Sequence, residues 1–156
     1  MPLSHVDEEG RARQVDVSGK PEVLRRAAAF ARVRLAPETA RLIRENQLQK
    51  GDVLAVAQLA GITAAKRTAE LIPLCHNIPI DRVEVRCTVL ADAVEIRTEA
   101  VCTARTGIEI EALTAAAVAA LTVYDMCKAV DKGMVIEEVR LLEKTKGPAA
   151  GSGGER

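Results

Sequence analysis

The amino-acid sequence predicts an α+β domain in which an antiparallel sheet carries helices on one face. Three observations lead to this prediction. Some segments alternate apolar and polar residues, as half-buried strands do, and others repeat apolar residues every three or four positions, as helices do. Their order along the chain is strand, helices, hairpin, long helix and strand. Such mixed runs of strands and helices are typical of α+β domains.

One strand and two helices are expected in the first half of the domain. The alternation in residues 28–35 predicts a half-buried strand with one apolar face: Ala31, Val33 and Leu35. Pro37 opens a short helix that runs through Glu45. Asp52 is placed to cap a longer helix over residues 53–72, which ends before Pro73.

The second half is expected to hold a hairpin, a long helix and a last strand. The hairpin follows from two alternating segments and the turn between them: residues 82–90, 94–104 and 91–93. Thr106 and Glu109 have the spacing of a capping box, which predicts that the long helix begins there and runs to about Val130. Gly133 ends it, and a strand over residues 134–142 closes the fold. We therefore expect a ferredoxin-like plait, and one that is oligomeric because the long helix is too apolar for the surface of a small monomer.

Composition limits what this domain binds. The chain has 156 residues, 48% apolar and 28% charged, which fits a single domain. Its 22 Lys and Arg balance 22 Asp and Glu, so no global charge attracts nucleic acid or anionic lipid. Two aromatic residues, Phe30 and Tyr124, are too few for a platform on which single-stranded nucleic acid stacks. We expect no nucleic-acid partner, and any anion site is a local cluster.

The cysteines and the ends of the chain predict a cytoplasmic protein. Four cysteines with no C-x-x-C pair indicate a reducing compartment. The polar N-terminus lacks the apolar centre of a signal peptide, and the longest apolar run, residues 115–121, is too short for a membrane span. We expect no membrane partner, a single domain over residues 14–146, and flexible tails over residues 1–13 and 147–156.

A polar stripe on the long helix is the first candidate site. At 100° per residue, Glu111, Thr114, Thr122 and Asp125 fall on one side, with Lys128 at its edge. On helix statistics alone, Asp125 and Lys128 form a surface ion pair worth about 0.3–0.5 kcal/mol. The functional alternative is an acid and a base held in one pocket, because a buried charge needs a partner.

The second candidate is the proline-bracketed turn over residues 72–79, which presents Cys75 and His76 just after a helix ends. Two prolines stiffen the turn, so His76 is either offered to a ligand or simply exposed. Cys75 also fits as a small apolar residue. A metal site needs more ligands than one adjacent Cys and His supply, and no second cluster exists, so we predict no metal site.

Weaker signals for anion binding come from basic residues near helix ends. Lys50 precedes the second helix, Lys66 and Arg67 lie towards its end, and Arg105 precedes the long helix. Helix N-termini favour anions, but none of these segments has the spacing of a phosphate loop. The plain alternatives are a capped loop and a solvated charged face.

Three runs of the chain resemble the molybdenum cofactor biosynthesis protein C family. They are VDVSGK, KGDVLAVAQLAGITAAKRTAELIPLCHNIPI and TGIEIEALTAAAVAALTVYDMCKAVDKGMVIEEVRLLEK: residues 15–20, 50–80 and 106–144. The motifs AAKRT, LIPLCH, EALTAA and YDMCKA are long and specific. The resemblance covers nearly everything from about His5 to Lys144.

The resemblance implies an enzyme of the first stage of molybdopterin synthesis, a phosphorus–oxygen lyase. Members convert 3′,8-cyclo-7,8-dihydro-GTP, made by a radical S-adenosylmethionine enzyme, to cyclic pyranopterin monophosphate and pyrophosphate. The family forms homo-hexamers, trimers of dimers of ferredoxin-like subunits, with active sites between subunits. It implies no tightly bound cofactor, with Mg²⁺ expected only through the substrate phosphates.

Matched motif by motif, the resemblance also implies roles for individual residues. Asp125, Lys128 and Lys50 are the expected catalytic residues, transferring protons while a purine ring is opened and rebuilt as a pterin. Further residues are expected to bind the substrate: Leu74, Cys75, His76, Glu109, Ile110, Glu111, Lys66, Arg67, Arg105 and Lys144. Where relatives have Gly-Lys-Thr-Gly, this chain has Ala104-Arg105-Thr106-Gly107. The arginine keeps the charge but has no proton to give up near neutral pH.

Two other classes of function remain open on the residues themselves. A non-catalytic binding module fits the same fold, since this architecture hosts many functions; Lys128→Ala then weakens binding without abolishing a reaction. In a purely structural oligomer, Asp125 and Lys128 are an interface ion pair, and Asp125→Ala destroys assembly. The enzyme is favoured because polar residues in three separated segments match one family.

Overall fold

The chain folds into a four-stranded antiparallel sheet with helices on one face, which confirms the α+β class. The computed structural model describes residues 4–148, so the outermost parts of both expected tails, residues 1–3 and 149–156, lie outside it. Four strands and four helices follow one another along the chain: β1 (Val23–Arg34), α1 (Pro37–Arg44), α2 (Val53–Lys66), α3 (Thr68–Leu71), β2 (Arg82–Val89), β3 (Ala93–Ala104), α4 (Glu109–Cys127) and β4 (Val135–Gly147).

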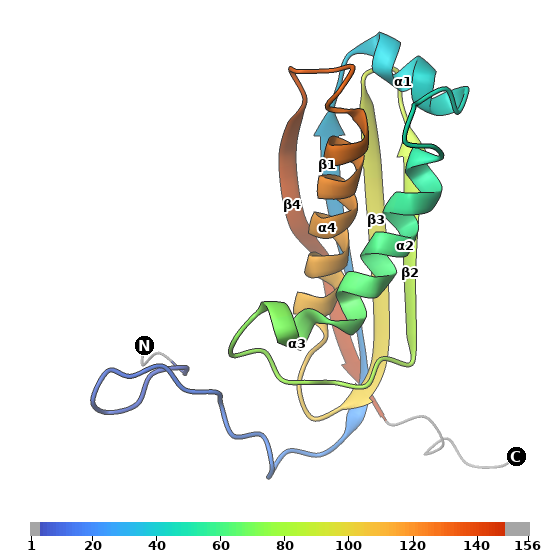
Figure 1. The fold of residues 1–156 in the computed structure, drawn as a ribbon. Helices are drawn as coiled ribbons and strands as arrows, with labels where there is room; N and C mark the ends of the chain where they lie inside the picture. Colours follow the sequence, from blue (N-terminus) through green and yellow to red (C-terminus); the bar gives the residue numbers. More distant parts are fainter. Residues whose placement is uncertain (1–3, 149–156) are drawn as a thin grey trace, which may run out of the picture.

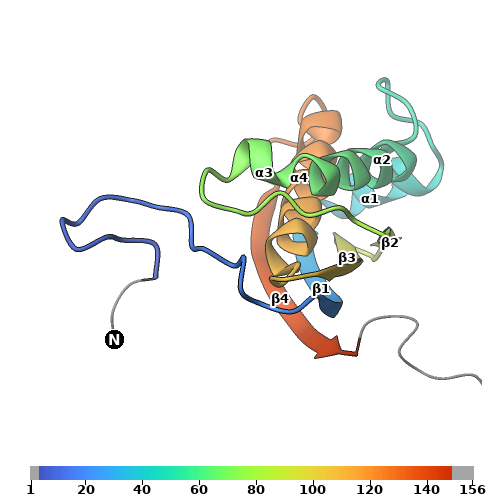
Figure 2. The ribbon, with the colours of Figure 1, turned by 90° about the horizontal axis from the view of Figure 1, so that it is seen from below.

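The strands lie in the order β2-β3-β1-β4, and each neighbouring pair is antiparallel. Figure 1 shows α4 and α2 side by side along the strands, and Figure 2 shows that both cover the same face of the sheet. The alternation expected in β1 is confirmed, because Ala31, Val33 and, just beyond the strand, Leu35 are buried towards the helices. Opposite residues of β3 complete this inner face, with Ala31 facing Ile96 and Val33 facing Val94.

Small side chains let α2 and α4 pack closely on the sheet. The buried positions of α4 are mostly alanine, each with no exposed surface: Ala112, Ala115, Ala116, Ala119 and Ala120. Gly61 of α2 lies where a Cβ atom would come within 2.9 Å of a Val85 methyl and 3.1 Å of the Ala115 carbonyl oxygen. A glycine is therefore needed at this crossing, because a methyl group has no room between the two backbones and β2.

The first and last strands of the chain, β1 and β4, extend beyond their predicted bounds. The strand expected over residues 28–35 begins at Val23, and the strand expected over residues 134–142 runs to Gly147. The two extensions pair with each other, Leu24 opposite Gly147. Neither shows the alternation of a half-buried strand. Two adjacent arginines interrupt the first, and the second is polar because β4 is an edge strand, where polar side chains protect an exposed ladder.

The single helix predicted over residues 53–72 is divided into two helices by a break at Arg67. Asp52 caps its start as expected, accepting a hydrogen bond from the backbone N–H of Ala55 at 3.1 Å. The helix ends at Lys66, and α3 follows after Arg67. The buried hydroxyl of Thr68 donates to the carbonyl oxygens of Ala64 and Ala65, both at 3.0 Å. A hydroxyl that bonds the preceding turn in this way competes with the regular helical ladder.

The capping box predicted at the start of the long helix is also wrong. The helix α4 begins at Glu109, and its N-cap residue, Ile108, has no side-chain capping bond. The Glu109 carboxylate lies instead beside Lys144 of β4, 3.7 Å from its ammonium group. The Glu109 carboxylate pairs with the Lys144 ammonium group on β4 and does not cap the helix. The first N–H groups of α4 therefore have no side-chain partner.

One described helix, α4, is long and apolar enough to cross a membrane by length and composition. It packs against α2 and the sheet, and 56% of its most apolar window is buried. This is the core helix of the domain, and its apolarity serves packing.

Candidate functional site

The polar residues at the C-terminal end of α4 form an ion cluster around one carboxylate. Asp125 lies on the last turn of the helix, and its two oxygens contact two lysines: Oδ2 is 2.9 Å from Lys50 Nζ, and Oδ1 is 3.0 Å from Lys128 Nζ. Hydrogen bonds from Lys50 and then from Lys128 hold the pKa of Asp125 below its usual value. The carboxylate therefore stays ionised and fixes both ammonium groups in one place.

Local backbone features position this cluster. Lys50 comes from the loop before α2, where Gly51 has a φ of +102°, a conformation that favours glycine. On the other side, Asp131 fastens the turn after α4. Its carboxylate accepts hydrogen bonds from the backbone N–H of Ala36 and the hydroxyl of Thr39, both at 2.8 Å. The turn that follows Lys128 is thus tied to Ala36, just after β1, and to α1.

A second cluster lies at the opposite end of α4. His76 Nε2 donates to the carbonyl oxygen of Val15 at 2.5 Å, and the Gln14 amide donates to the carbonyl oxygen of Cys75 at 3.1 Å. The Cys75 thiol donates to Glu111 Oε1 at 3.6 Å. The N-terminal segment and the proline-bracketed turn therefore meet over the first turn of α4. The bond to Val15 places a hydrogen on Nε2 of His76, which leaves Nδ1 for another partner.

Burial controls the acidity of the two groups in this second cluster. Glu111 is only 2% exposed, and its Oε2 has no hydrogen-bond partner among residues 4–148. Burial raises the pKa of Glu111, and burial followed by the nearby Glu111 raises the pKa of Cys75 to about 11. The thiol therefore stays protonated at neutral pH, and it acts as a hydrogen-bond donor.

A cavity of about 590 Å³ opens beside this second cluster. Five of the residues expected to bind substrate line it: Leu74, Cys75, His76, Glu109 and Ile110. Apolar side chains from the N-terminal segment and the turn complete the wall, among them Val15, Val17 and Ile78. A cavity with an apolar wall and a few polar groups suits a flat, hydrogen-bonding ring.

The structure does not bring all expected residues together. At a rise of about 1.5 Å per residue, Asp125 lies about 21 Å along the axis of α4 from Glu111. The lysine cluster and the cavity therefore do not share one substrate within one copy. Lys66, Arg67 and Arg105 do not line this cavity; the carbonyl oxygen of Arg105 accepts a hydrogen bond from Arg25 at 3.4 Å.

Comparison with known proteins identifies the family. Residues 14–147 match the sequence profile of the MoaC family. The chain belongs to the MoaC family. Three curated relatives, each named cyclic pyranopterin monophosphate synthase, support this assignment. The protein of Thermomicrobium roseum is 58% identical over 147 residues, which cover 93% of this chain and 89% of the relative.

The other two relatives match as broadly. The protein of Peptoclostridium acidaminophilum is 52% identical over 147 residues, 94% of each chain. The protein of Heliobacterium modesticaldum is 55% identical over 148 residues, 94% of this chain and 93% of the relative. The match to the MoaC family over residues 14–147 therefore includes both clusters and most of the cavity wall.

Sequence reasoning missed several residues that build the MoaC cavity in this chain. Lys20 lines it, and Gln14 and Val15 hold its Cys75 and His76. The sequence signal that could have found these residues was the run of residues 15–20, which contributed to the family resemblance but was not assigned a role in the site. In the part of the chain that the structure describes, no three His, Cys, Asp or Glu side chains gather as metal ligands would.

Proposed function

We propose that the chain acts as a cyclic pyranopterin monophosphate synthase that converts 3′,8-cyclo-7,8-dihydro-GTP to cyclic pyranopterin monophosphate and pyrophosphate. The observation that carries this function is membership of the MoaC family over residues 14–147, with three synthases at 52–58% identity. Its place is in molybdenum cofactor biosynthesis, after the radical S-adenosylmethionine enzyme that makes the substrate.

In this proposal Lys50 and Lys128 transfer protons, and Asp125 orients their amines. Rebuilding a purine as a pterin takes several proton transfers, and a positioned acid or base typically contributes about 10²- to 10⁴-fold to a rate. A lysine acts in this way where desolvation and neighbouring cations lower its pKa. The arrangement is supported by the contacts of 2.9 Å and 3.0 Å that place both amines on one carboxylate.

The side chains of the lysine cluster are open to solvent in a single copy of the chain. The side chains of Lys50, Asp125 and Lys128 are 49%, 54% and 57% exposed. Leu121 and Tyr124 on the same end of α4 are 57% and 37% exposed, although they are large apolar or aromatic side chains. Apolar surface next to an open catalytic cluster favours a contact with a second copy, which would desolvate both.

We therefore propose that each active site is assembled from two copies, in a homo-hexamer built as a trimer of dimers. One copy supplies the lysine cluster, and its partner supplies the cavity beside His76 and Glu111. The separation of about 21 Å between these clusters supports this arrangement. The β-α-β-β-α-β order of the main elements and the strand order β2-β3-β1-β4 support a ferredoxin-like plait for each subunit.

Substrate binding is assigned to the cavity residues and to Lys144. Leu74, Cys75, His76, Glu109, Ile110 and Glu111 would hold the ring system. Lys66, Arg67 and Arg105 keep only a proposed supporting role, because they lie outside the cavity walls. Mg²⁺ would enter with the phosphates, since the described carboxylates offer it no ready-made ligand set. A cytoplasmic location is supported by four cysteines that are all free thiols.

The first experiment is the reaction itself. Purified protein is mixed with the cyclised dihydro-GTP, and cyclic pyranopterin monophosphate and pyrophosphate are followed, beside Lys128→Ala checked for an intact oligomer. We expect product from the wild type and none from the variant. Absence of product from both contradicts the synthase and favours a binding module.

A complementation experiment tests the shared site. Lys128→Ala and His76→Ala proteins, each inactive alone, are unfolded together and refolded as a mixture. If each site uses both copies, random pairing restores about a quarter of wild-type activity, because half the dimers are mixed and one of their two sites is intact. The matched control is a mixture of Lys128→Ala and Asp125→Ala proteins, which are altered in the same cluster. This mixture should stay inactive. An inactive first mixture contradicts the shared site.

A further inference from the structure

The two lysines of the lysine cluster come from segments that both lie beside α1. Lys128 is the C-cap residue of α4 and begins the turn that leads to β4. Lys50 lies on the other segment, a short loop that leaves α1 after Arg44 and enters α2 at Val53. Figure 1 shows α1, the start of α2 and the end of α4 at the same end of the domain.

Asp131 joins the first of these segments to α1. Its Oδ2 atom accepts hydrogen bonds from the backbone N–H of Ala36 and from the hydroxyl of Thr39, both at 2.8 Å. Its Oδ1 atom accepts a third hydrogen bond, from the backbone N–H of Gly133 at 3.0 Å. Ala36 is the N-cap residue of α1 and has no side-chain cap of its own, so Asp131 adds a negative charge where this helix favours one. The carboxylate therefore fastens the turn after α4 to the start of α1.

The loop that carries Lys50 is also fixed to α1. The backbone N–H of Gln47 donates to the carbonyl oxygen of Leu42, within α1, at 2.9 Å. Leu48 is buried in the hydrophobic core, and its carbonyl oxygen accepts a hydrogen bond from the N–H of Gly51 at 3.0 Å. A displacement of α1 therefore displaces Lys50 as well.

The end of α4 needs an anchor, because the last turn of a helix has carbonyl groups without helical partners and opens readily. The Lys128 side chain is 57% exposed, and Asp125 is its one ion-pair partner within residues 4–148. The Lys132 ammonium donates to the carbonyl oxygen of Lys128 at 2.7 Å, but it belongs to the same turn. In the described part of this turn, Asp131 is the side chain that hydrogen-bonds to another element.

We propose that Asp131 is a positioning residue for the lysine cluster. By holding the turn after α4 on α1, which leads into the Lys50 loop, it keeps both ammonium groups 2.9–3.0 Å from the Asp125 carboxylate. The inference rests on the proposed function, in which both lysines transfer protons. Such chemistry depends steeply on position, and a displacement of about 1 Å is enough to lower a rate about 100-fold.

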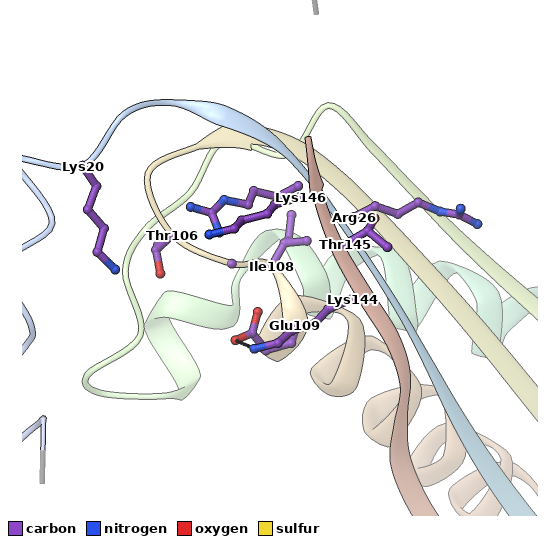
Figure 3. A pocket seen from close by; sticks show the side chains of 10 residues that line it. Lys20, Arg26, Thr106, Ile108, Glu109, Lys144, Thr145 and Lys146 are labelled. Atoms are coloured by element: carbon purple, nitrogen blue, oxygen red, sulfur yellow. Dashed lines mark ion pairs between the residues drawn. The ribbon is translucent and has the colours of Figure 1, made fainter. Parts of the chain in front are cut away.

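Asp131 lies at the opposite end of α4 from the cavities of its own copy. It lines neither the cavity beside His76 nor the one that Figure 3 shows at the start of α4. In that view Glu109 pairs with Lys144 at the first turn of the helix, whereas Asp131 follows the last turn. A variant of Asp131 should therefore change the rate of the chemical step and leave substrate binding almost unchanged.

Steady-state kinetics with the cyclised dihydro-GTP test this role. For Asp131→Ala, assayed as an intact oligomer well below its thermal midpoint, kcat should fall about tenfold while KM changes less than about twofold. Thr39→Val removes one donor to Asp131 and should lower kcat by a smaller factor, whereas Thr39→Ser keeps the hydroxyl and the wild-type kcat. In the Asp131→Ala background, Thr39→Val should have no further effect, because the two residues act through one hydrogen bond.

Ile96→Val is the matched control for lost stability. Ile96 is fully buried in β3, so the variant destabilises the domain, but the residue has no hydrogen-bonded link to the lysine cluster. Its kcat should equal that of the wild type. A loss of kcat in Ile96→Val as large as in Asp131→Ala, a loss in Asp131→Ala that appears mainly in KM, or wild-type kcat in Asp131→Ala overturns the positioning role.

Hydrogen exchange separates this inference from the proposed function, because it needs no activity. In Asp131→Ala, the amides of residues 124–131 and of residues 45–52 should exchange faster than in the wild type, and those of the β2–β3 hairpin should not. A wild type that makes no cyclic pyranopterin monophosphate contradicts the synthase, and the exchange data still test the link between the two segments. Unchanged exchange over residues 45–52 overturns the inference even where the synthase is active.

Discussion

The Lys50 ammonium lies 2.9 Å from Oδ2 of Asp125, although the two residues are 75 positions apart in the sequence. Lys128, three residues after Asp125, reaches the other oxygen of the same carboxylate. The pair between Lys50 and Asp125 therefore ties the loop before α2 to the last turn of α4. It also makes the acid, rather than either lysine, the centre of the cluster.

Replacing Asp125 by Asn should lower kcat about 100-fold, because neither amine is then held in position by a charge. The pH profile of the rate should also change, because the variant lacks the carboxyl group of Asp125, whose pKa the two lysines lower. Rates are measured from about pH 6 to 10 for both proteins. Asp52→Asn is the control, because Asn still caps α2 and Lys50 keeps its partner. An unchanged profile in Asp125→Asn removes Asp125 from the mechanism.

Replacing Glu111 by Gln should raise the thermal midpoint at pH 8 while reducing activity. Burial raises the pKa of Glu111 in the folded state above its value in the unfolded chain. The side chain therefore contributes most to the free energy of unfolding when the pH is below the unfolded pKa. This contribution is lost as the pH rises through the folded pKa. A neutral amide removes this dependence. Thermal unfolding at pH 5 and pH 8 measures it, with the exposed Glu70→Gln as control. A variant less stable than the wild type at pH 8 contradicts this account of Glu111.

Asp131 should show the opposite pH dependence. Burial tends to raise its pKa, but hydrogen bonds from Ala36, Thr39 and Gly133 outweigh this and lower the pKa below 3.8. Its contribution to stability is therefore present above pH 3.8 and lost as the pH falls through the folded pKa. Asp131→Asn should unfold at a lower temperature than the wild type at pH 7, and the gap should narrow towards pH 3. The gap is expected to be absent for Asp92→Asn in the exposed hairpin.

Gly61→Ala should destabilise the domain by about 1–3 kcal/mol, the usual cost of forcing an extra methyl into a packed core. The added Cβ meets a Val85 methyl at 2.9 Å and the Ala115 carbonyl oxygen at 3.1 Å. Urea unfolding at fixed protein concentration measures the loss. Gly19→Ala is the control, because its Cβ would have nothing within 4 Å. Equal stabilities of the two variants would mean that α2 moves away from α4 at little cost.

The periodicity of the sequence predicted those features that depend only on residues close together in one helix or strand. The buried face of β1 and the Asp125–Lys128 pair follow from spacings of two and three residues, and both are present. Contacts between elements do not have such a pattern. The catalytic role of Lys50 was expected only from the family resemblance, and Lys20 was missed. Nothing in the local sequence indicates which distant loop lies against a helix end.

The failed local predictions have the same cause. Thr106 and Glu109 have the residue types of a capping box, but Lys144 on β4 attracts the Glu109 carboxylate, so tertiary electrostatics replace the local motif. The polar extension of β4 to Gly147 is fixed by its partner strand β1, not by its own composition. The distance between the two halves of the candidate site likewise depends on the length of α4, which places them at opposite ends of the domain.

Tyr124 gives this protein a built-in optical reporter. It is the chain's single tyrosine, no tryptophan accompanies it, and its ring lies 37% exposed beside Asp125 on the last turns of α4. Ultraviolet emission from the unlabelled protein therefore comes from the end of the helix that carries the lysine cluster. Burial of that ring by another copy or by substrate changes its quantum yield and its access to a quencher such as iodide, so the covering of the lysine cluster can be measured without a dye.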